Sequence, residues 1–249
     1  MKSTEIKQNR LYDEFAHLWT LVSNPADYAE EAANCRRVLR DKLGEGRHEI
    51  LELGVGGGNN LSHLTADFKA TAVDISEKML ANSRKLNPEV EHFVGDMRTV
   101  RLGRTFKAVL IQDAINYMQT EDDLRAAFAT AREHLRPGGV LVTSPDYFLE
   151  TFEDGVVRHR KQSEEKIELT YIEYDYDLDL ADSKFEAIAF YLIREKGQLR
   201  VELDRHVLGL FALKTWLELM EEAGFVVEKY DCDVSDVRRQ SFLLVGVKK

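Results

Sequence analysis

The stretch "ILELGVGGGNNL", residues 50–61, decides the fold of this chain. Its first half is an apolar run typical of a buried strand, and its second half is the densest glycine cluster in the sequence. Glycine lets a backbone turn tightly and lets a ligand approach it closely. In open α/β sheets such a loop follows the first strand and holds a nucleotide-like cofactor. The chemistry of that cofactor is the first question the sequence raises.

The residues around this stretch alternate between strand and helix patterns. Ser76 is a good N-cap, and Thr120 with Asp123 forms a capping box. Alternation at this pitch predicts a doubly wound, mostly parallel seven-stranded sheet of Rossmann-like α/β class, covered by helices on both faces. The expected strands are 48–55, 69–75, 91–96, 107–113 and 138–144, and the expected helices are 26–43, 60–68, 77–86 and 120–136.

The pattern changes after Pro145. Residues 167–180 alternate strictly between tyrosine or leucine and acidic residues, and residues 185–211 predict two strands around a turn at Lys196–Gly197. We expect an antiparallel β insert over 147–210 within a single domain, 1–249. The acidic stripe at 173–179 is interpreted as a solvated face, and the tyrosine face as packing on the main domain or a second subunit. The α/β pattern resumes with a helix at 212–224 and strands at 225–233 and 241–249.

Composition narrows the class of partner. The chain of 249 residues has 44% hydrophobic and 31% charged residues, which is typical of one large globular domain. A formal net charge of −10 argues against nucleic acid and favours a small molecule. No apolar run reaches the ~18 residues that span a membrane, and the N-terminus lacks a signal-peptide pattern, so we expect a cytoplasmic protein without a membrane partner. Cys35 and Cys232 show no metal spacing, and no metal site is expected.

The glycine loop departs from both phosphate-binding patterns. A dinucleotide fingerprint counted from Gly54 needs glycine where this chain has Asn59, and a triphosphate loop needs a lysine that the stretch lacks. The pattern present is Glu-x-Gly-x-Gly-x-Gly, and acidic residues also end the second and third expected strands. Acidic side chains at three strand ends suit a phosphate-free, cationic ligand. The residues are Glu52, Gly54, Gly56, Gly58, Asp74 and Asp96.

With "REHLRPGGVLV" before the fifth strand, these motifs resemble class I S-adenosylmethionine-dependent methyltransferases. The resemblance implies S-adenosylmethionine as cofactor and S-adenosylhomocysteine as product. It implies that Asp74 binds the ribose hydroxyls, that Asp96 accepts from the adenine amino group, and that the Met97 amide meets the ring. Further cofactor contacts are expected from Tyr12, Trp19, Ile75, Met79 and Gln112.

A closer resemblance covers most of the chain. The segments "GDMRTVRLGRTFKAV", "PDYFLETFEDGVV" and "DRHVLGLFALKTWLELMEEAGF", with the N-terminal "LYDEFAHLW", resemble bacterial dTDP-amino-sugar N,N-dimethyltransferases. This implies an enzyme that transfers methyl to a sugar amine, mostly by positioning. It also implies that Tyr12 closes over the methyl donor, and that the insert builds the acceptor cavity and the contact of a homodimer.

The chain departs from that group where the fourth and fifth strands end, in "QDAINY" and "SPDY". These segments place Asp113, Asn116, Asp146 and Tyr147 at the expected acceptor pocket. His206, in a segment similar to the group's "H-x-x-x-L-F", is expected to contact the acceptor, and a neutral histidine can take a proton. The catalytic candidates are Tyr12, Tyr117 and His206.

Three other functions stay open at this point. An O-methyltransferase would need a general base beside a hydroxyl, a role that His206 could fill. A cofactor-binding module without turnover would share the loop but have no acceptor cavity. An NAD-dependent dehydrogenase would bind NAD in place of S-adenosylhomocysteine.

Overall fold

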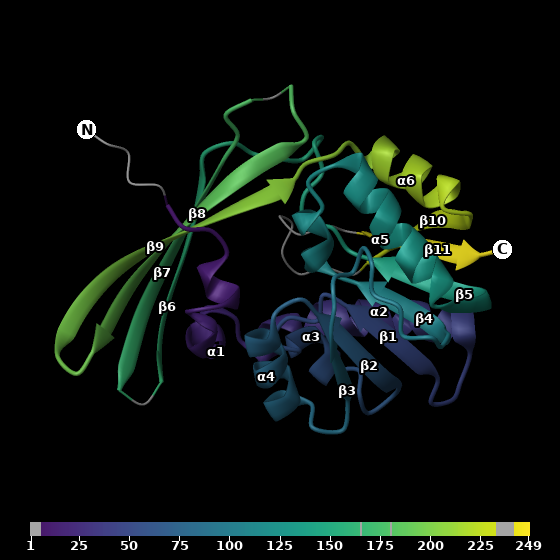
Figure 1. Ribbon diagram of the computed structural model, residues 1–249, viewed down its shortest axis with the longest axis horizontal. Helices are drawn as coiled ribbons and strands as arrows, with labels where there is room; N and C mark the ends of the chain where they lie inside the picture. The colour runs from purple at the N-terminus through teal and green to yellow at the C-terminus, as the bar shows by residue number, and fades with distance from the viewer. Residues whose placement is uncertain (1–5, 165, 180, 233–241) are drawn as a thin grey trace.

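The computed structural model describes residues 6–164, 166–179, 181–232 and 242–249. The described residues form a seven-stranded sheet flanked by helices, and a four-stranded sheet that extends away from it (Figure 1). The seven strands lie in the order β10-β11-β5-β4-β1-β2-β3. All are parallel except β11, which runs antiparallel to its neighbours β5 and β10. The predicted mostly parallel, Rossmann-like sheet with an antiparallel extra sheet is therefore confirmed.

The element bounds follow the predicted alternation. The large sheet contains β1 (Glu49–Leu53), β2 (Lys69–Asp74), β3 (Glu91–Val94), β4 (Phe106–Ile111), β5 (Leu135–Thr143), β10 (Phe225–Asp231) and β11 (Phe242–Lys248). Its helices are α2 (Ala29–Leu43), α3 (Asn59–Ser62), α4 (Glu77–Leu86), α5 (Glu121–Glu133) and α6 (Leu213–Glu222), with the short η4 (Asp113–Tyr117) after β4. The N-terminal part forms η1 (Arg10–Tyr12), η2 (Ala16–Leu18), α1 (Trp19–Val22) and η3 (Pro25–Tyr28).

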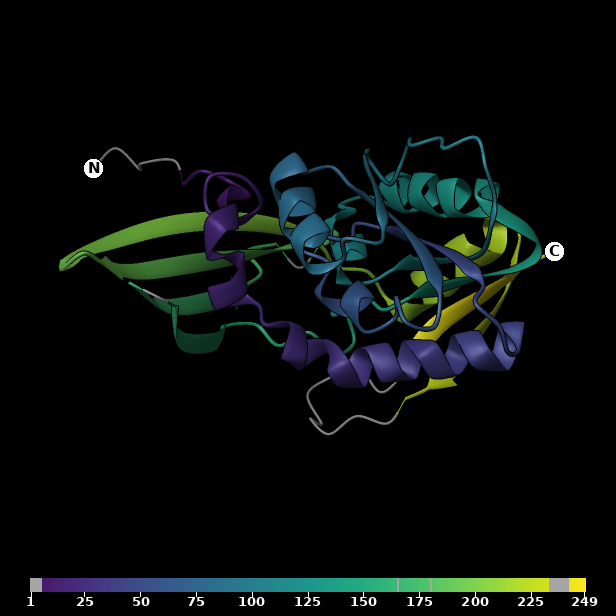
Figure 2. The same ribbon diagram turned by 90° about the horizontal axis from the view of Figure 1, so that it is seen from below.

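Apolar residues on both faces of the strands hold these layers together. Along β1, Leu51 packs in one cluster with α5 and α6, whereas its neighbour Ile50 packs in another with α2 and α3. Figure 2 shows α2 and α5 on opposite sides of the sheet. Because every second residue of a strand points to the same face, burial of adjacent residues requires cover on both sides. The switch in strand order between β1 and β4 places the glycine loop at the carboxyl edge of this covered sheet.

The helix boundaries differ from the sequence expectation at two places. The helix expected over 60–68 is reduced to α3, and turns follow it. The helix expected to continue through Arg136 ends at Glu133, and β5 already begins at Leu135. A register shift between β4 and β5 accommodates Pro137, which has no backbone N–H to donate.

The four-stranded sheet consists of β6 (Val156–Glu164), β7 (Ile167–Tyr176), β8 (Lys184–Glu195) and β9 (Gln198–Gly209), all antiparallel. The turn predicted at Lys196–Gly197 joins β8 to β9, and both residues have positive φ angles, of 51° and 78°. The edge strand β6 was not predicted, because its charged, exposed residues show no alternation. The division into one domain, 1–249, with an insert over 147–210 stays a prediction.

The interpretation of the acidic stripe was wrong for its first half. Strand pairing places Glu173 and Asp175 on the face of this sheet that the N-terminal segment covers, which we call its inner face. Asp175 is only 1% exposed. Tyr174, in contrast, is 39% exposed on the outer face. Alternation shows that two faces differ, but it does not tell which face is covered. Asp177 and Asp179 lie beyond the end of β7, where Asp177 is half-buried and Asp179 is exposed, as expected for a solvated stripe.

The N-terminal residues cover this inner face. Leu11, Phe15 and Leu18 form a buried cluster with Tyr191 and Ile193 of β8. The backbone adds a pair of hydrogen bonds, because the Asn9 N–H donates to the Arg205 carbonyl and the Arg205 N–H donates to the Lys7 carbonyl. The chain before α2 is therefore fixed between the small sheet and the large one.

The capping box provides a test of the fold. The Thr120 hydroxyl accepts a hydrogen bond of 3.1 Å from the Asp123 N–H at the start of α5. Thr120→Ala leaves that amide without its partner, so we expect the free energy of unfolding to fall by about 1 kcal/mol. Urea denaturation measures this change, and Thr120→Ser is the control that should retain most of the stability. Equal midpoints for Thr120→Ala and the parent chain would contradict the assignment.

Candidate active site

The glycine loop is held in place by Asp74 at the end of β2. One oxygen of Asp74 accepts from the Gly56 N–H and the other from the Ser76 N–H, both at 2.8 Å. Burial raises the pKa of this carboxyl, although the two amides oppose the shift. Asp74 thus fixes both the loop after β1 and the start of α4.

The three glycines of the motif meet different requirements. All three have positive φ angles: 79° at Gly54, 54° at Gly56 and 80° at Gly58. A Cβ at Gly54 would lie 2.5 Å from the Ala114 side chain, and one at Gly58 would lie 2.4 Å from the Ser83 hydroxyl. These two glycines therefore permit close packing, whereas a Cβ at Gly56 would meet only the Met79 methyl group, at an ordinary contact distance of 3.8 Å.

Asn59 has a structural role in place of the missing glycine. Its amide donates to the carbonyl and the hydroxyl of Ser23, at 3.1 and 3.0 Å. On the same loop, Gly57 lies against the Trp19 indole, which a Cβ would meet at 2.0 Å. The buried Trp19 Nε1 has no hydrogen-bond partner in the described part of the chain. The N-terminal elements therefore rest directly on the glycine loop.

The other expected cofactor residues fall into two groups. Ile75 is 69% exposed and lines a pocket of about 380 Å³ with Tyr12 and Ser76, so it is available to a ligand. Met79 is fully buried beneath the loop and supports it. Gln112 is also buried, with its oxygen accepting from Ser144 at 2.8 Å.

Asp96 is already engaged by a neighbour. The Arg98 side chain contacts both oxygens of Asp96, with a shortest distance of 2.6 Å, and also pairs with Asp123 at 2.6 Å. These bonds lower the pKa of the Asp96 carboxyl. Met97 is buried, and its methyl group lies beside Gly54. The predicted adenine contact at Asp96 therefore requires the carboxylate to share its oxygens with Arg98.

Glu52 is the most deeply placed acid of the motif. It is 3% exposed, and its Oε2 has no hydrogen-bond partner among the described residues. Burial raises its pKa well above the usual value, and the charges of Asp113, Glu31 and Asp74 raise it further. A cation placed near these acids would relieve their mutual repulsion.

The expected acceptor residues come together after β4 and β5. The Asn116 side-chain oxygen accepts from the Asp146 N–H at 2.9 Å, which joins the two strand ends. Desolvation raises the pKa of Asp113 and of Asp146, and the charge of Asp113 adds to the shift at Asp146. Tyr147 donates to Asp175 at 3.2 Å, so the acceptor side is connected to the inner face of the small sheet.

The three catalytic candidates meet in one cluster, although they are far apart in the sequence. The Tyr12 and Tyr117 hydroxyls lie 2.8 Å apart, and the Tyr117 hydroxyl lies 2.8 Å from His206 Nδ1. The rings pack edge to face, with Tyr12 5.6 Å from both of the others. Whether these residues act in catalysis stays a prediction.

Sequence analysis missed the residues of the small sheet's inner face. Asp204 is fully buried and contacts His206 Nε2 at 3.1 Å. Glu173 is held against Tyr171 and Arg158 on the same face. Asp204 precedes His206 by two positions, and this i, i+2 spacing on a strand could have identified it as a same-face neighbour.

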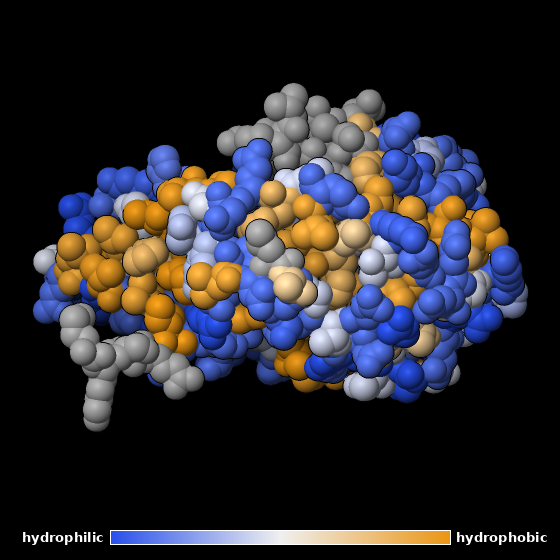
Figure 3. Space-filling model, turned by 90° about the horizontal axis from the view of Figure 1, so that it is seen from above, coloured by the Kyte–Doolittle hydropathy of each residue, from blue (hydrophilic) through white to orange (hydrophobic). Residues whose placement is uncertain are grey.

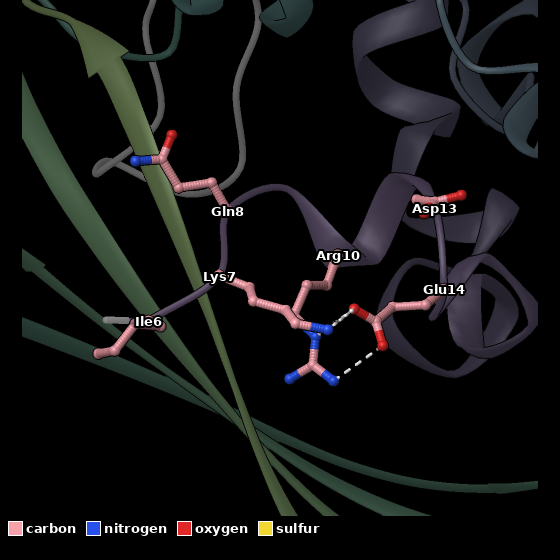
Figure 4. A pocket seen from close by; sticks show the side chains of 6 residues that line it. All are labelled: Ile6, Lys7, Gln8, Arg10, Asp13 and Glu14. Atoms are coloured by element: carbon pink, nitrogen blue, oxygen red, sulfur yellow. Dashed lines mark hydrogen bonds and ion pairs between the residues drawn. The ribbon is translucent and has the colours of Figure 1, made fainter. Parts of the chain in front are cut away.

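A second pocket, of about 530 Å³, is shown in Figure 4. Its charged side chains bind one another, because Lys7 and Arg10 both contact Glu14. The pKa of the Glu14 carboxyl falls to about 2 as a result. None of the predicted site residues lines this pocket. Within the described ranges, no group of three or more histidine, cysteine or acidic side chains could hold a metal ion.

Comparisons with known proteins place this geometry in a class. Residues 50–139 match the family described as Methyltransferase domain. A curated relative from Streptomyces venezuelae, dTDP-3-amino-3,4,6-trideoxy-alpha-D-glucopyranose N,N-dimethyltransferase, is 39% identical over 155 residues. That alignment covers 61% of this chain, and the chain spans 63% of the relative's length.

Two solved structures are similar over nearly the whole chain. The sugar N-methyltransferase KedS8 from Streptoalloteichus has a TM-score of 0.83 and 28% identity, covering 100% of this chain and 98% of its own. CalS10, an amino pentose methyltransferase from Micromonospora echinaspora solved with bound S-adenosylmethionine, has a TM-score of 0.79 and 25% identity, covering 95% and 97%. The predicted resemblance of this chain to S-adenosylmethionine-dependent methyltransferases is confirmed. Its resemblance to the amino-sugar N,N-dimethyltransferases is confirmed as well.

The loop geometry generates a prediction on cofactor affinity. Asp74→Ala removes the expected ribose contact and frees the Gly56 and Ser76 amides, so S-adenosylhomocysteine should bind about 10- to 100-fold more weakly. Isothermal titration calorimetry measures the affinity. Asp231→Ala, at the end of β10 on the far edge of the sheet, is the matched control and should bind normally. Unchanged affinity in Asp74→Ala would remove Asp74 from the binding site.

Proposed function

We propose that this protein transfers a methyl group from S-adenosylmethionine to an amine of a small molecule, a nucleotide-linked amino sugar. The observation that carries the proposal is the group of acids where the acceptor would lie. Burial raises the pKa of Asp146, the charges of Asp113, Glu31 and Glu173 raise it further, and Arg158 opposes them. Mutual repulsion of this kind favours a positively charged ligand.

An amine fits these acids better than a hydroxyl does. An ammonium group brings the missing positive charge, whereas a neutral hydroxyl leaves the repulsion in place. The names of the similar proteins agree with an amino-sugar acceptor. In the reaction, the nitrogen lone pair forms the bond to the methyl carbon, and the electron pair of the broken carbon–sulfur bond stays with sulfur.

The main contribution of the fold to the reaction would be to align the methyl donor with the acceptor. The glycine loop and Trp19 would hold the donor on one side, and the small sheet would hold the acceptor on the other. Holding two reactants in line can lower a barrier by about 7–11 kcal/mol. The proposal therefore needs no metal and no covalent intermediate on the protein.

The acceptor can be tested with matched compounds. A dTDP-linked amino sugar should give S-adenosylhomocysteine and an N-methylated product, measured by mass spectrometry. The same nucleotide sugar with a hydroxyl in place of the amine should give neither. Methylation of the hydroxyl compound alone would establish an O-methyltransferase. Binding of NAD without S-adenosylhomocysteine in calorimetry would exclude a methyltransferase, and cofactor binding without turnover on any acceptor would favour a binding module.

We also propose that the protein forms a homodimer through the outer face of the small sheet, in the cytoplasm. Strand pairing aligns Ile172, Phe190 and Leu203 across three strands of this face. Phe190 is 36% exposed, and Val201 on the same face is 61% exposed, so apolar side chains of this face are accessible. Hydrophobic residues gather over this end of the molecule (Figure 3). Apolar patches of this kind mark contact surfaces. Within the described residues, no helix is long and apolar enough to cross a membrane.

The dimer can be tested by placing a charge on this face. Phe190→Glu should convert the dimer to a monomer, because a buried carboxylate without a partner is costly. Light scattering coupled to size-exclusion chromatography measures the mass. Val226→Glu adds the same charge on exposed β10 and should leave the dimer intact. A monomer in the parent chain at micromolar concentration would overturn the proposal.

A further inference from the structure

The cluster of Tyr12, Tyr117 and His206 continues to a fourth residue. His206 Nε2 lies 3.1 Å from Asp204 Oδ2, and this same oxygen accepts from the Leu11 N–H at 2.8 Å. Asp204 is fully buried and His206 is 4% exposed, whereas both tyrosines are half-buried. Four polar groups therefore form one continuous line from the protein interior to Tyr12, which lines the same pocket as Ile75 and Ser76.

The donors and acceptors available on these four groups fix the direction of each hydrogen bond along the line. An ionised carboxylate only accepts, so His206 must donate from Nε2 to Asp204. A neutral imidazole then has Nδ1 free as an acceptor, which receives the Tyr117 hydroxyl proton. The Tyr117 oxygen is left to accept from Tyr12. Every donor points inward, and the last free lone pairs lie on the Tyr12 oxygen.

The outer end of the line faces the acids that would attract the acceptor. Asp113 is close enough to affect the pKa of both Tyr12 and Tyr117. Burial raises the pKa of each hydroxyl well above its usual value, so neither tyrosine ionises by itself near neutral pH. A tyrosine in this position passes a proton on only when it gives up its own at the same time.

We propose that Asp204 is a positioning residue that fixes the tautomer of His206, and that Tyr12 and Tyr117 conduct the acceptor's proton to His206 Nδ1. The inference rests on the proposed function and deepens it. The acids near the acceptor attract an ammonium but also hold it protonated, so an N-methyltransferase of this kind needs a proton outlet. Asp204 orients His206 so that Nδ1 is free to receive the proton.

Three protons move inward in this step. One leaves the acceptor nitrogen for the Tyr12 oxygen, the Tyr12 proton moves to the Tyr117 oxygen, and the Tyr117 proton moves to His206 Nδ1. The nitrogen keeps the electron pair of the broken N–H bond. The net result is an imidazolium cation paired with the Asp204 carboxylate, and both tyrosines are neutral again. The imidazolium afterwards releases its proton to solvent between turnovers.

Other charged and titratable groups surround the line. Besides its four members, titratable and charged side chains face it from the N-terminal segment, from η4 and from the other strands of the small sheet. These are Arg10, Tyr28, Asp113, Tyr171, Glu173 and Tyr191.

The test compares the pH profile of single-turnover methyl transfer in Asp204→Asn and Tyr117→Phe with that of the parent chain. In Asp204→Asn the new side-chain amide can donate to His206 Nε2 and so reverse the tautomer, and Tyr117→Phe removes the hydroxyl that links the line. Both variants should be about 100-fold slower at pH 7 and approach the parent rate above about pH 9, where the amine arrives deprotonated. The double variant should be no slower than either single one.

Tyr191→Phe is the matched control. Its hydroxyl is buried near Asp204 and has no partner among the described side chains, so its removal should leave the profile unchanged. S-adenosylhomocysteine affinity should stay within about twofold in all variants. A loss of rate that is equal at every pH would mean that Asp204 only supports the fold, and would overturn the proposal.

Nitrogen-15 NMR of the S-adenosylhomocysteine complex reads the tautomer without any acceptor, with His206→Gln to assign the signals. The parent chain should show a protonated Nε2 and an unprotonated Nδ1, and Asp204→Asn should reverse them. The opposite tautomer in the parent chain overturns the inference whatever the substrate. The expected tautomer in a protein that methylates no amine supports the orienting role of Asp204 and refutes the proposed function.

Discussion

The docking of the N-terminal segment on β9 is the contact on which the rest of the site depends. Backbone bonds between Lys7, Asn9 and Arg205 set its register, and the Leu11 N–H adds a bond to Asp204. This register brings the Tyr12 hydroxyl to Tyr117. A few residues later the same segment places Trp19 on Gly57 of the glycine loop. The segment 7–19 therefore contacts both the glycine loop, where the donor is expected, and Tyr117, near the expected acceptor.

The two sheets contribute charged and titratable groups of different kinds to the site. The large sheet presents acids at the ends of β1, β2 and β4, and desolvation raises the pKa of Glu52, Asp74 and Asp113. Under the proposed function the sulfonium donor and the ammonium acceptor are both cations, so the same acids would attract both. The small sheet contributes His206, which is proposed to take the proton, and Asp204, which orients it. Charge attraction and proton removal, which oppose each other, are thus assigned to different parts of the fold.

Much of the large sheet could be predicted from the sequence because its signals are local. The alternation of strands and helices, the Ser76 and Thr120 caps and the glycine spacing all act over short distances. The small sheet was harder, because alternation alone does not reveal which face is covered. Glu173 was assigned to solvent for this reason, and β6 gave no pattern at all. Tyr12, Tyr117 and His206 were named through resemblance, but their contact depends on the relative placement of three distant elements. Asp204 precedes His206 by two positions, and this i, i+2 spacing on a strand places both residues on the same face.

The double use of one Asp204 oxygen has a consequence for the order of events in a catalytic cycle. That oxygen receives both the Leu11 N–H and the His206 N–H, and Tyr12 is the next residue after Leu11. If this segment left β9, the outermost link of the proposed proton line would leave with it. A molecule that is open in this way would have no outlet for the acceptor's proton. The bond that assembles the site would then also tie methyl transfer to the docked position of the segment.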